Sequence, residues 1–484
     1  MHGLVTLRRL LTLVAVILAA PSALAGPLDD AHVADTGFSG PTSGDLTAIY
    51  WNPAGLGMLQ GPQLMIGGSL QATSVRVDRT SIDPTTGTNP GSTSFSTASG
   101  SGTLQPLRWP LGPASFIGIG AGFGHRFAIA LALYSPFSSN LSMPADAPTR
   151  YQLVSMDLNH LAPTIGLAIH ATDSIQIGVA PSFIFPTAHL VFKETPGGST
   201  SEDLATDAKY DLATQGILVP AYILSFGAQY RRGRFSLGIS YTSAPLGTGG
   251  MLNLPLGNVH IYQDSAAGKE ADLCDSTNPH NPNCLAGQLS YRLPSIYNLG
   301  ATWQASKNWS VTGIVRWLRY GGHDKVSILL SGPPDKTALG TSLPDHVVLY
   351  RGFQDSFDLR GRVVWENKQM RVGGTLRLET SAVPAANVNA AAIDGTKLEP
   401  SVAVEMRIWR QIRMSAGYAF LWMFPVDTGT SVFDPTAAST CASASGDLST
   451  PACQARMNGQ ARPSAAGNYR QWRQTLSVMT TFAF

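Results

Sequence analysis

The feature that most constrains this chain is an alternation of apolar and other residues that recurs from about residue 62 to the end. Successive side chains of a β-strand point to opposite faces, so such alternation predicts strands with one apolar face. In the segment 126–134, the odd-numbered residues are large and apolar, whereas the even-numbered residues from Ala128 to Ala132 are alanine. The segment 115–123 alternates in the same way. Only Gly124 and His125 separate the two segments, which predicts a tight hairpin.

The same pattern predicts five further hairpins, whose short turns lie near residues 172–173, 231–233, 305–307, 367–369 and 410–411. With a first strand near 62–77 and a last strand near 470–484, we expect about fourteen strands. Longer segments separate the hairpins, near 78–103, 137–150, 187–212, 246–287, 321–351, 383–394 and 425–469. Short turns on one rim and long loops on the other are typical of outer-membrane barrels, and not of soluble β-sandwiches or propellers.

The two faces of the predicted strands differ as a barrel wall requires. Between residues 356 and 378, apolar side chains alternate with charged ones, namely Asp358, Arg360, Arg362, Glu366, Arg371 and Arg377. Such charges would be costly in a dry core, but in a lumen they can pair and contact water. Tryptophans fall near strand ends, as in interfacial girdles. The fold class predicted is therefore an all-β transmembrane antiparallel barrel.

Residues 1–25 have the pattern of a cleaved signal peptide. Arg8 and Arg9 precede an apolar run, Leu10 to Ala20, and Ala23 to Ala25 form a small-x-small cleavage pattern. The run is shorter than the ~20 residues of a membrane-spanning helix. We therefore expect export from the cytoplasm.

Charge and composition exclude some partners. The chain has 33 Lys+Arg and 31 Asp+Glu, and loss of Arg8 and Arg9 leaves no net charge, so nucleic acid is not an expected partner. Charged residues make up 13%, about half of the usual ~25%. No spacing typical of a metal site or hydrolase motif is present, and we expect no metal, no cofactor and no enzymatic activity.

Four cysteines form two local pairs, Cys274 with Cys284 and Cys441 with Cys453. In an exported chain these pairs favour two disulfides in long loops, although four cysteines allow three connectivities. A zinc site is the alternative, and it is disfavoured because neither pair has a short C-x₂₋₄-C spacing.

Residues 26–61 do not alternate. They are small, polar and rich in glycine, and they end in YWNPAGLGMLQG. Pro53 can open a short helix that Asn52 caps. A compact segment of this kind can plug a wide barrel, which would otherwise be an open pore. The alternative is a disordered periplasmic tail.

Nearly the whole mature chain resembles the FadL-type family of outer-membrane transporters for long-chain fatty acids and other hydrophobic compounds. The resemblance rests on GDLTAIYWNPAGL (44–56), LYSPF (133–137), LAPTIGLAIHATDSIQIGVAPSF (161–183), SFGAQYRRGRFSLGISYTS (225–243), LPSIYNLGATWQASKNWSVTGIVRW (293–317) and RVGGTLRLETSAVP (371–384). It implies a fourteen-stranded barrel (62–484) with an N-terminal hatch (26–61), in which Asn52, Pro53, Ala54 and Gly55 match the hatch motif. The alternating last strand, which ends at Phe484, resembles the terminal strand by which such barrels are recognised for insertion.

The resemblance implies passive, multi-pass outer-membrane transport in a Gram-negative bacterium. The resemblance further implies that loops capture the ligand, that a lumen pocket binds it above the hatch, and that a kinked strand releases it sideways. The third strand, 126–134, shows no bulge, so the position of that opening is not predicted. We expect a monomer whose partners are a hydrophobic ligand and outer-membrane lipid. The alternatives are a general porin-like channel and, less favoured, a barrel lipase.

Two groups of residues are candidates for ligand contact. Met251, Leu252, Leu254 and Leu256 lie in an unusually apolar segment that we expect to be an exposed loop, and they are candidates for ligand capture. Arg360 and Arg377 are candidates for binding a carboxylate in the lumen. The alternatives are that the apolar residues pack on neighbouring loops and that the arginines only pair with acidic residues of the wall.

Overall fold

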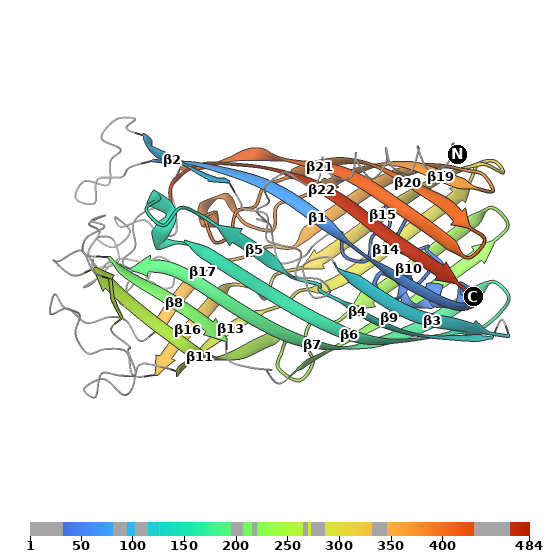
Figure 1. The fold of residues 1–484 in the computed structure, drawn as a ribbon, viewed down its shortest axis with the longest axis horizontal. Helices are drawn as coiled ribbons and strands as arrows, with labels where there is room; N and C mark the ends of the chain where they lie inside the picture. Colours follow the sequence, from blue (N-terminus) through green and yellow to red (C-terminus); the bar gives the residue numbers. More distant parts are fainter. Residues whose placement is uncertain are drawn as a thin grey trace, which may run out of the picture.

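The computed structural model describes residues 32–80, 94–101, 115–124, 126–194, 207–214, 220–264, 270–272, 286–331, 346–429 and 465–484. Fourteen antiparallel strands close into one barrel (Figure 1), as predicted. In order around the wall they are β1 (Gly61–Thr80), β3 (Phe116–Phe123), β4 (Phe127–Tyr134), β6 (Ser155–His170), β7 (Ile175–Glu194), β9 (Ala221–Arg232), β10 (Phe235–Thr242), β14 (Ser295–Gln304), β15 (Trp309–Arg319), β18 (Ser356–Glu366), β19 (Met370–Glu379), β20 (Lys397–Trp409), β21 (Ile412–Thr428) and β22 (Gly467–Ala483).

The hairpins predicted from alternation are confirmed. Phe123 pairs with Phe127 across the first short turn, and Arg232 pairs with Phe235 across another. The barrel closes where β1 meets β22, with an unbroken register from Gln63↔Ala483 to Arg79↔Gly467. The short turns gather at one end of the barrel, at the right of Figure 1.

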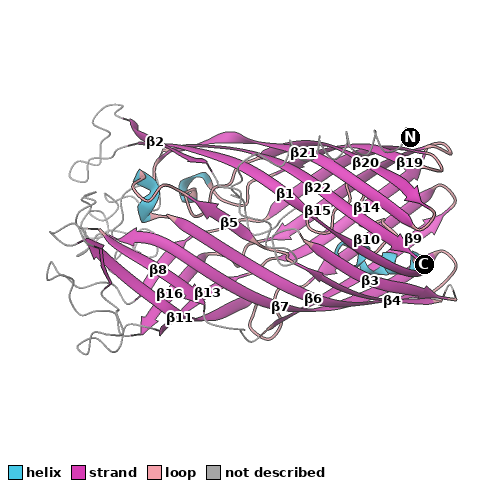
Figure 2. Ribbon diagram, viewed as in Figure 1, coloured by secondary structure: helices cyan, strands magenta, loops and turns pink. Residues whose placement is uncertain are grey.

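The long segments are not simply loops, and this is a correction to the sequence analysis. They contain the other eight strands of the 22-stranded sheet. These are β2 (Ser94–Ser101), β5 (Ser139–Ser142), β8 (Ala208–Thr214), β11 (Met251–Asp264), β12 (Glu270–Asp272), β13 (Ala286–Arg292), β16 (Lys325–Ser331) and β17 (His346–Tyr350). Five of them extend the wall beyond the ends of β9, β10, β14 and β15: β8 pairs with the far part of β7, and β11, β13, β16 and β17 follow in that order. We call this extension the upper sheet. The described residues also contain three 3-10 helices, η1 (Pro53–Met58), η2 (Pro148–Tyr151) and η4 (Ala385–Asn387), and one α-helical turn, α2 (Ala48–Trp51) (Figure 2).

An apolar belt with aromatic borders surrounds the barrel. On β15, outward-facing Trp309 and Trp317 mark its two borders, a spacing close to the ~9–11 residues of a spanning strand. At the outer border, the rings of Tyr241 and Tyr297 lie 4.8 Å apart, Trp317 lies 4.8 Å from Tyr297, and Phe357 lies 6.2 Å from Trp317. We call these four residues the outer aromatic row.

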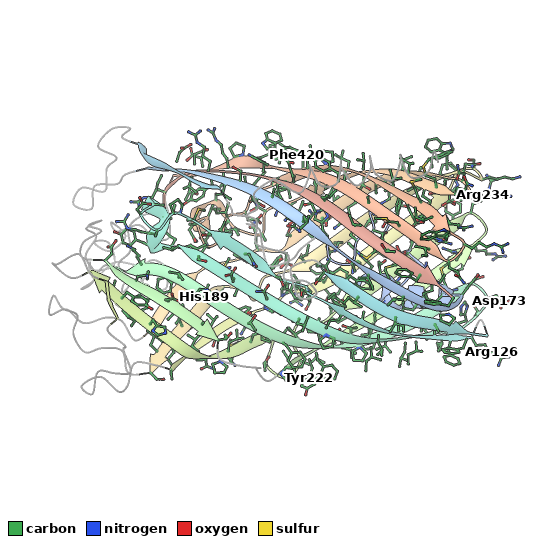
Figure 3. All side chains as sticks on the ribbon, viewed as in Figure 1. Arg126, Asp173, His189, Tyr222, Arg234 and Phe420 are labelled. Carbon is green, nitrogen blue, oxygen red and sulfur yellow. The ribbon has the colours of Figure 1, made fainter. Side chains whose placement is uncertain are left out.

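The upper part of the barrel stands beyond this belt. Exposed Tyr222 and Phe420 lie near mid-length in Figure 3, whereas Arg126, Asp173 and Arg234 lie at the short-turn end. His189, on the far part of β7, lies on the other side of Tyr222. The membrane-spanning part is therefore the half with the short turns, and the upper sheet lies outside it.

Within the described ranges, no helix is both long enough and apolar enough to cross a membrane. The predicted signal peptide, residues 1–25, lies outside the described residues, and so do Cys274, Cys284, Cys441 and Cys453.

Candidate functional site

The described part of the N-terminal segment, residues 32–60, lies inside the ring of strands near its short-turn end (Figure 2). Helix η1 contacts β4, β6, β7 and β9, and Leu56 on η1 is fully buried. Leu46, Ile49 and Trp51 are buried beside it. The segment thus has a small core of its own, which it shares with the wall.

Asn52 joins this segment to the wall. Its Nδ2 donates to the carbonyl oxygens of Pro41 (2.7 Å) and Ala228 (3.1 Å). Its Oδ1 accepts from the backbone N–H of Ala54 (3.2 Å) and so caps η1, and Pro53 takes the first helical position. Every polar atom of this buried amide therefore has a partner.

Glycines on the inner face of the wall make room for the Asn52–Pro53 turn. A Cβ atom on Gly227 would lie 1.9 Å from Asn52 Oδ1, and one on Gly178, its cross-strand partner, would lie 2.4 Å from the carbonyl carbon of Pro53. On β10, a Cβ on Gly238 would lie 2.0 Å from the carbonyl oxygen of Pro41. At these positions the absence of a side chain is required for packing.

Opposite the Asn52–Pro53 turn, strands β15, β18, β19 and β20 present a group of paired charges to the lumen. We call it the ionic cluster, and it comprises Arg316, Asp358, Arg360, Arg377, Glu379, Lys397 and Glu399. Asp358 is fully buried and lies 2.6 Å from Arg360 Nη2, 3.0 Å from Arg377 Nε and 3.8 Å from Arg316 Nη1. Arg377 also pairs with Glu379 and, at 3.5 Å, with Glu399. Lys397 Nζ lies 2.9 Å from Glu379.

The ionic cluster holds the N-terminal segment. The guanidinium carbons of Arg316 and Arg360 lie 4.8 and 4.9 Å from the ring of Trp51. His32 Nε2 lies 3.4 Å from Glu399 Oε2. Beside the cluster, Arg362 donates to the carbonyl oxygen of Ser39 (2.8 Å). Cation–π contacts and charge-assisted hydrogen bonds therefore fix this segment against the wall.

The structure places both arginines suggested for carboxylate binding, Arg360 and Arg377, in the lumen and within this cluster. Each already has a carboxylate partner on the wall, Asp358 for both, and each is buried. Glu379 was not considered in the sequence analysis, although its position two residues after Arg377 puts it on the same face.

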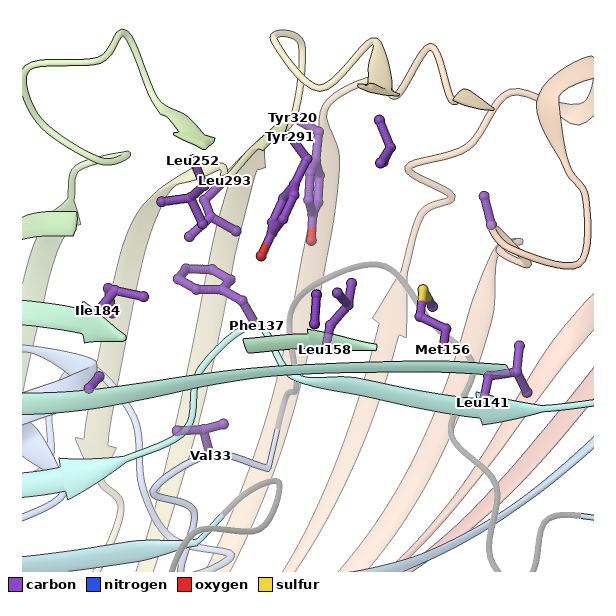
Figure 4. Packing of buried hydrophobic residues seen from close by; sticks show 14 of the residues in the cluster. Val33, Phe137, Leu141, Met156, Leu158, Ile184, Leu252, Tyr291, Leu293 and Tyr320 are labelled. Atoms are coloured by element: carbon purple, nitrogen blue, oxygen red, sulfur yellow. The ribbon is translucent and has the colours of Figure 1, made fainter. Parts of the chain in front are cut away.

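Above the N-terminal segment, inside the upper sheet, lies an enclosed apolar cavity that we call the upper cavity. It has room for about 10 Å³, roughly one water molecule. Its walls include Met156 and Leu158 on β6, Leu190 and Phe192 on β7, and Leu289 on β13. Figure 4 shows Met156 and Leu158 across the interior from Tyr291.

The apolar segment expected as an exposed capture loop is a strand instead. Leu252, Leu254 and Leu256 are buried on the inner face of β11, and Met251 is half-buried. The register with β8 shifts between Leu256 and Asn258. This bulge returns Val259 and Ile261 to the inner face, where they are also buried. These side chains therefore belong to the core of the upper sheet.

Four polar side chains also line the upper cavity: Gln152, Tyr291, His323 and Arg351. The Tyr291 hydroxyl lies 2.6 Å from His160 Nε2. His323 Nδ1 donates a hydrogen bond to the carbonyl oxygen of Arg292. Burial, and to a smaller extent the charge of Arg351, lowers the pKa of His323 to about 3. His323 is therefore neutral at physiological pH.

Arg351 differs from the lumen arginines. It is buried, and among the described residues its Nε has no hydrogen-bond partner and no carboxylate pairs with its guanidinium group. Its Nη2 reaches only the sulfur of Met156, at 4.0 Å. Burial lowers the pKa of Arg351 to about 10, so it still carries its charge at neutral pH. A buried cation of this kind can receive an anionic or strongly polar group.

Among the described residues, no group of three or more His, Cys, Asp or Glu side chains is arranged to hold a metal ion.

Comparison with known proteins gives a consistent result. The family profile described as outer membrane protein transport protein (OMPP1/FadL/TodX) matches residues 19–427. No curated protein matches significantly. Among solved structures, a Pseudomonas aeruginosa FadL homologue is 12% identical, with a TM-score of 0.68 over 96% of this chain and 100% of its own.

Two further structures are similar. The Pseudomonas putida toluene transporter TodX is 14% identical, with a TM-score of 0.59 over 93% of this chain and 99% of its own. The Ralstonia pickettii toluene transporter TbuX is 11% identical, with a TM-score of 0.55 over 92% and 98%. At these identities the likeness establishes the fold.

Proposed function

Because the chain belongs to the OMPP1/FadL/TodX family of outer membrane transport proteins, we propose that it carries hydrophobic compounds, long-chain fatty acids among them, passively across the Gram-negative outer membrane. The protein is a transporter and not an enzyme. In this proposal the upper sheet admits the ligand, the upper cavity binds it, the N-terminal segment acts as a hatch, and the wall releases it into the membrane.

The observation that carries the proposal is the upper cavity. A hydrophobic solute gains ~25 cal/mol for each Å² that it removes from water. The cavity offers an apolar lining, and its small volume means that a ligand must displace side chains. Met156 suits this because its unbranched thioether repacks easily. A water-filled porin would not need a closed apolar chamber above a packed segment.

We place the polar end of the ligand at Arg351. Arg360 and Arg377 already share Asp358, so a ligand carboxylate would have to compete with a buried wall carboxylate there. Arg351 has no such competitor among the described residues. A fatty-acid carboxylate at this position would turn an unpaired buried charge into a paired one.

Lateral release has a candidate position between β1 and β3. One edge of β1 pairs with β22 along its length. The other edge pairs with β3 only from Gly61 to Gly67, and with β2 from Ser74 onward. Among the described residues, none pairs with residues 68–73 on that edge. Ser74 is opposite Trp472, an exposed residue whose ring stacks on that of Phe420, which lies near mid-length of the barrel (Figure 3), so residues 68–73 lie on the membrane-spanning side of this level. An opening here would let an apolar ligand enter lipid without crossing water.

The test is uptake through a blocked cavity. Leu289→Trp fills the upper cavity from β13, whereas Leu329→Trp adds the same ring to the outer surface of neighbouring β16. We expect Leu289→Trp to reduce radiolabelled oleate uptake at least tenfold in cells that depend on this protein, and Leu329→Trp to leave uptake near the wild-type rate. Equal uptake by both variants would refute the proposed route. Swelling of proteoliposomes in small sugars would indicate a porin, and release of fatty acid from phospholipid would indicate a lipase.

A further inference from the structure

A hollow of about 320 Å³ lies on the outer surface of the barrel, where the upper sheet meets the lower wall. We call it the outer hollow. Arg292, at the end of β13, and Arg319, at the end of β15, both line it. Ser295 begins β14 and is the cross-strand partner of Arg319, so the three polar side chains come from adjoining strand ends.

Both arginines are on the outer face of the wall. Tyr291, the neighbour of Arg292, is buried in the interior, so Arg292 belongs to the opposite face of β13. Arg319 is exposed and shares its face of β15 with Trp317. It lies two residues beyond that tryptophan, about 7 Å along the strand. The hollow is therefore just above the outer aromatic row, at the height of lipid head groups.

Among the described residues, no carboxylate neutralises the charges in the outer hollow. Neither Arg292 nor Arg319 forms an ion pair with any described residue. The nearby carboxylate of Asp355 accepts hydrogen bonds from Trp317 Nε1 (2.9 Å) and from the backbone N–H of Gly321 (3.0 Å). The hydrogen-bond partners of Asp355 are thus Trp317, which belongs to the outer aromatic row, and Gly321, and not the two guanidinium groups.

Glycines keep this surface concave. Gly249, Gly250, Gly321 and Gly322 all line the hollow. A Cβ on Gly322 would lie 3.2 Å from Nη1 of Arg292, which shows how closely the guanidinium group lies against the backbone. The arginine is thus held at the wall, with less side-chain freedom to lose when it binds an anion.

From this geometry we propose that the outer hollow binds a phosphate group on the head of an outer-leaflet lipid. Two guanidinium groups on one concave surface match the geometry and charge of a phosphate. The apolar belt below would hold the acyl chains of the same molecule. The site is distinct from the proposed transport route, because its two arginines lie on the outer face of the wall, whereas the upper cavity lies within the upper sheet; His323 lines both.

The experiment uses the purified full-length protein in detergent micelles, with binding followed by native mass spectrometry. Three probes are compared: lipid A with its phosphates, the same lipid after phosphate removal, and inorganic phosphate. The variants are Arg292→Gln, Arg319→Gln and the pair together. The matched control is Arg470→Gln, because Arg470 is an exposed arginine on β22 whose Nε donates to Asn468 (2.8 Å). Heat-modifiability on gels verifies that each barrel is folded.

We expect each hollow variant to bind lipid A about tenfold more weakly, the size of a lost charge-assisted contact, and Arg470→Gln to bind as wild type. Dephosphorylated lipid should bind the wild type as weakly as lipid A binds the double variant. Wild-type affinity in the folded single variants would overturn the proposal. Competition by inorganic phosphate at the concentrations at which lipid A binds would also overturn it, since it would indicate a site for free anions. Oleate uptake should be unchanged in all these variants, so failure here is distinguishable from failure of the transport proposal.

Discussion

The amide Nδ2 of Asn52 donates a hydrogen bond to the carbonyl oxygen of Ala228, 3.1 Å away, and so ties the turn before η1 to strand β9. The neighbouring residue in β9, Gly227, leaves the space that the Asn52 side chain occupies. The contact thus depends on a donor in the N-terminal segment and on a missing side chain in the wall.

This contact predicts that Gly227→Ala displaces the Asn52–Pro53 turn. The new Cβ would lie 1.9 Å from Asn52 Oδ1, and overpacking of this kind costs ~1–3 kcal/mol. We expect a lower unfolding temperature by heat-modifiability and a higher single-channel conductance in planar bilayers. Gly361→Ala on β18 is the control, because its Cβ would meet nothing within 4 Å. Identical behaviour of the two variants would rule out a tight fit at Gly227.

A second prediction concerns Asp358, on which three arginines converge. Asp358→Asn removes the shared carboxylate and leaves buried positive charges facing one another, so we expect a loss of ~3–5 kcal/mol in stability. Glu366→Gln, in a half-exposed pair with Arg371 at 3.3 Å, should cost less than ~1 kcal/mol. Urea unfolding followed by tryptophan fluorescence would measure both. A small effect of Asp358→Asn would show that the ionic cluster does not hold the wall together.

The upper sheet should lose stability at alkaline pH. Hydrogen bonds to Asp157 and Asp211 raise the pKa of His189 to about 9 on a part of β7 that stands outside the membrane. A raised pKa means that the protonated form stabilises the fold. Its contribution is complete below the unfolded value, ~6.5, and is lost as the pH rises through about 9. Hydrogen-exchange protection factors in β6, β7 and β8, which correct for the intrinsic rise of exchange with pH, should therefore fall between these values. His189→Gln should flatten that dependence; a wild-type pH profile in the variant would contradict the assignment.

Arg351 should discriminate between ligands with and without a carboxylate. Arg351→Met keeps an unbranched chain but removes the charge, so oleate affinity should fall tenfold or more while the affinity for an uncharged hydrocarbon of similar length stays the same. Arg360→Met and Arg377→Met serve for comparison, and we expect them mainly to destabilise the barrel. If folded Arg360→Met and Arg377→Met lost oleate binding and Arg351→Met kept it, the carboxylate would instead bind in the ionic cluster.

The cysteine pairs remain a prediction, because all four residues lie outside the described ranges. Peptide mapping of the unreduced protein should yield Cys274 linked to Cys284 and Cys441 linked to Cys453. Free thiols, or a cross-linked pair that joins the two segments, would show that sequence proximity does not determine the pairing.

The wall of the barrel could be predicted from the sequence because its strands are simple repeats. From Phe127 to Leu133 every second residue is apolar, and nothing interrupts the phase. The upper sheet is less regular. On β11, Pro255 and the bulge after Leu256 break the alternation, so a real strand looks like an apolar loop. Shorter runs do alternate, such as Val326, Ile328 and Leu330 on β16, and this alternation could have indicated a strand.

The candidate site was less accessible to sequence reasoning. Alternation places Asp358 and Arg360 on one face of β18, so their pairing could have been expected from the sequence. Arg351 follows β17 and lies in no alternating run, and its role depends on which chain segments meet around it. No local pattern shows that a charged residue has no carboxylate partner among the described residues, because that is a property of the assembled interior.

Strand β7 is shared by two walls. Its first part, from Ile175 to Ile184, pairs with β9 in the ring that crosses the membrane, and its last part, from His189 to Glu194, pairs with β8 in the upper sheet. The parts that face lipid and the parts that enclose the upper cavity are therefore different segments of the chain, even within strands such as β6 and β7 that contribute to both. Substitutions in β8, β11, β13 and β16 can alter which molecules the protein accepts without touching the segments needed to assemble in the bilayer. Such modularity would let selection diversify the cargo of this barrel while its insertion into the membrane stays the same.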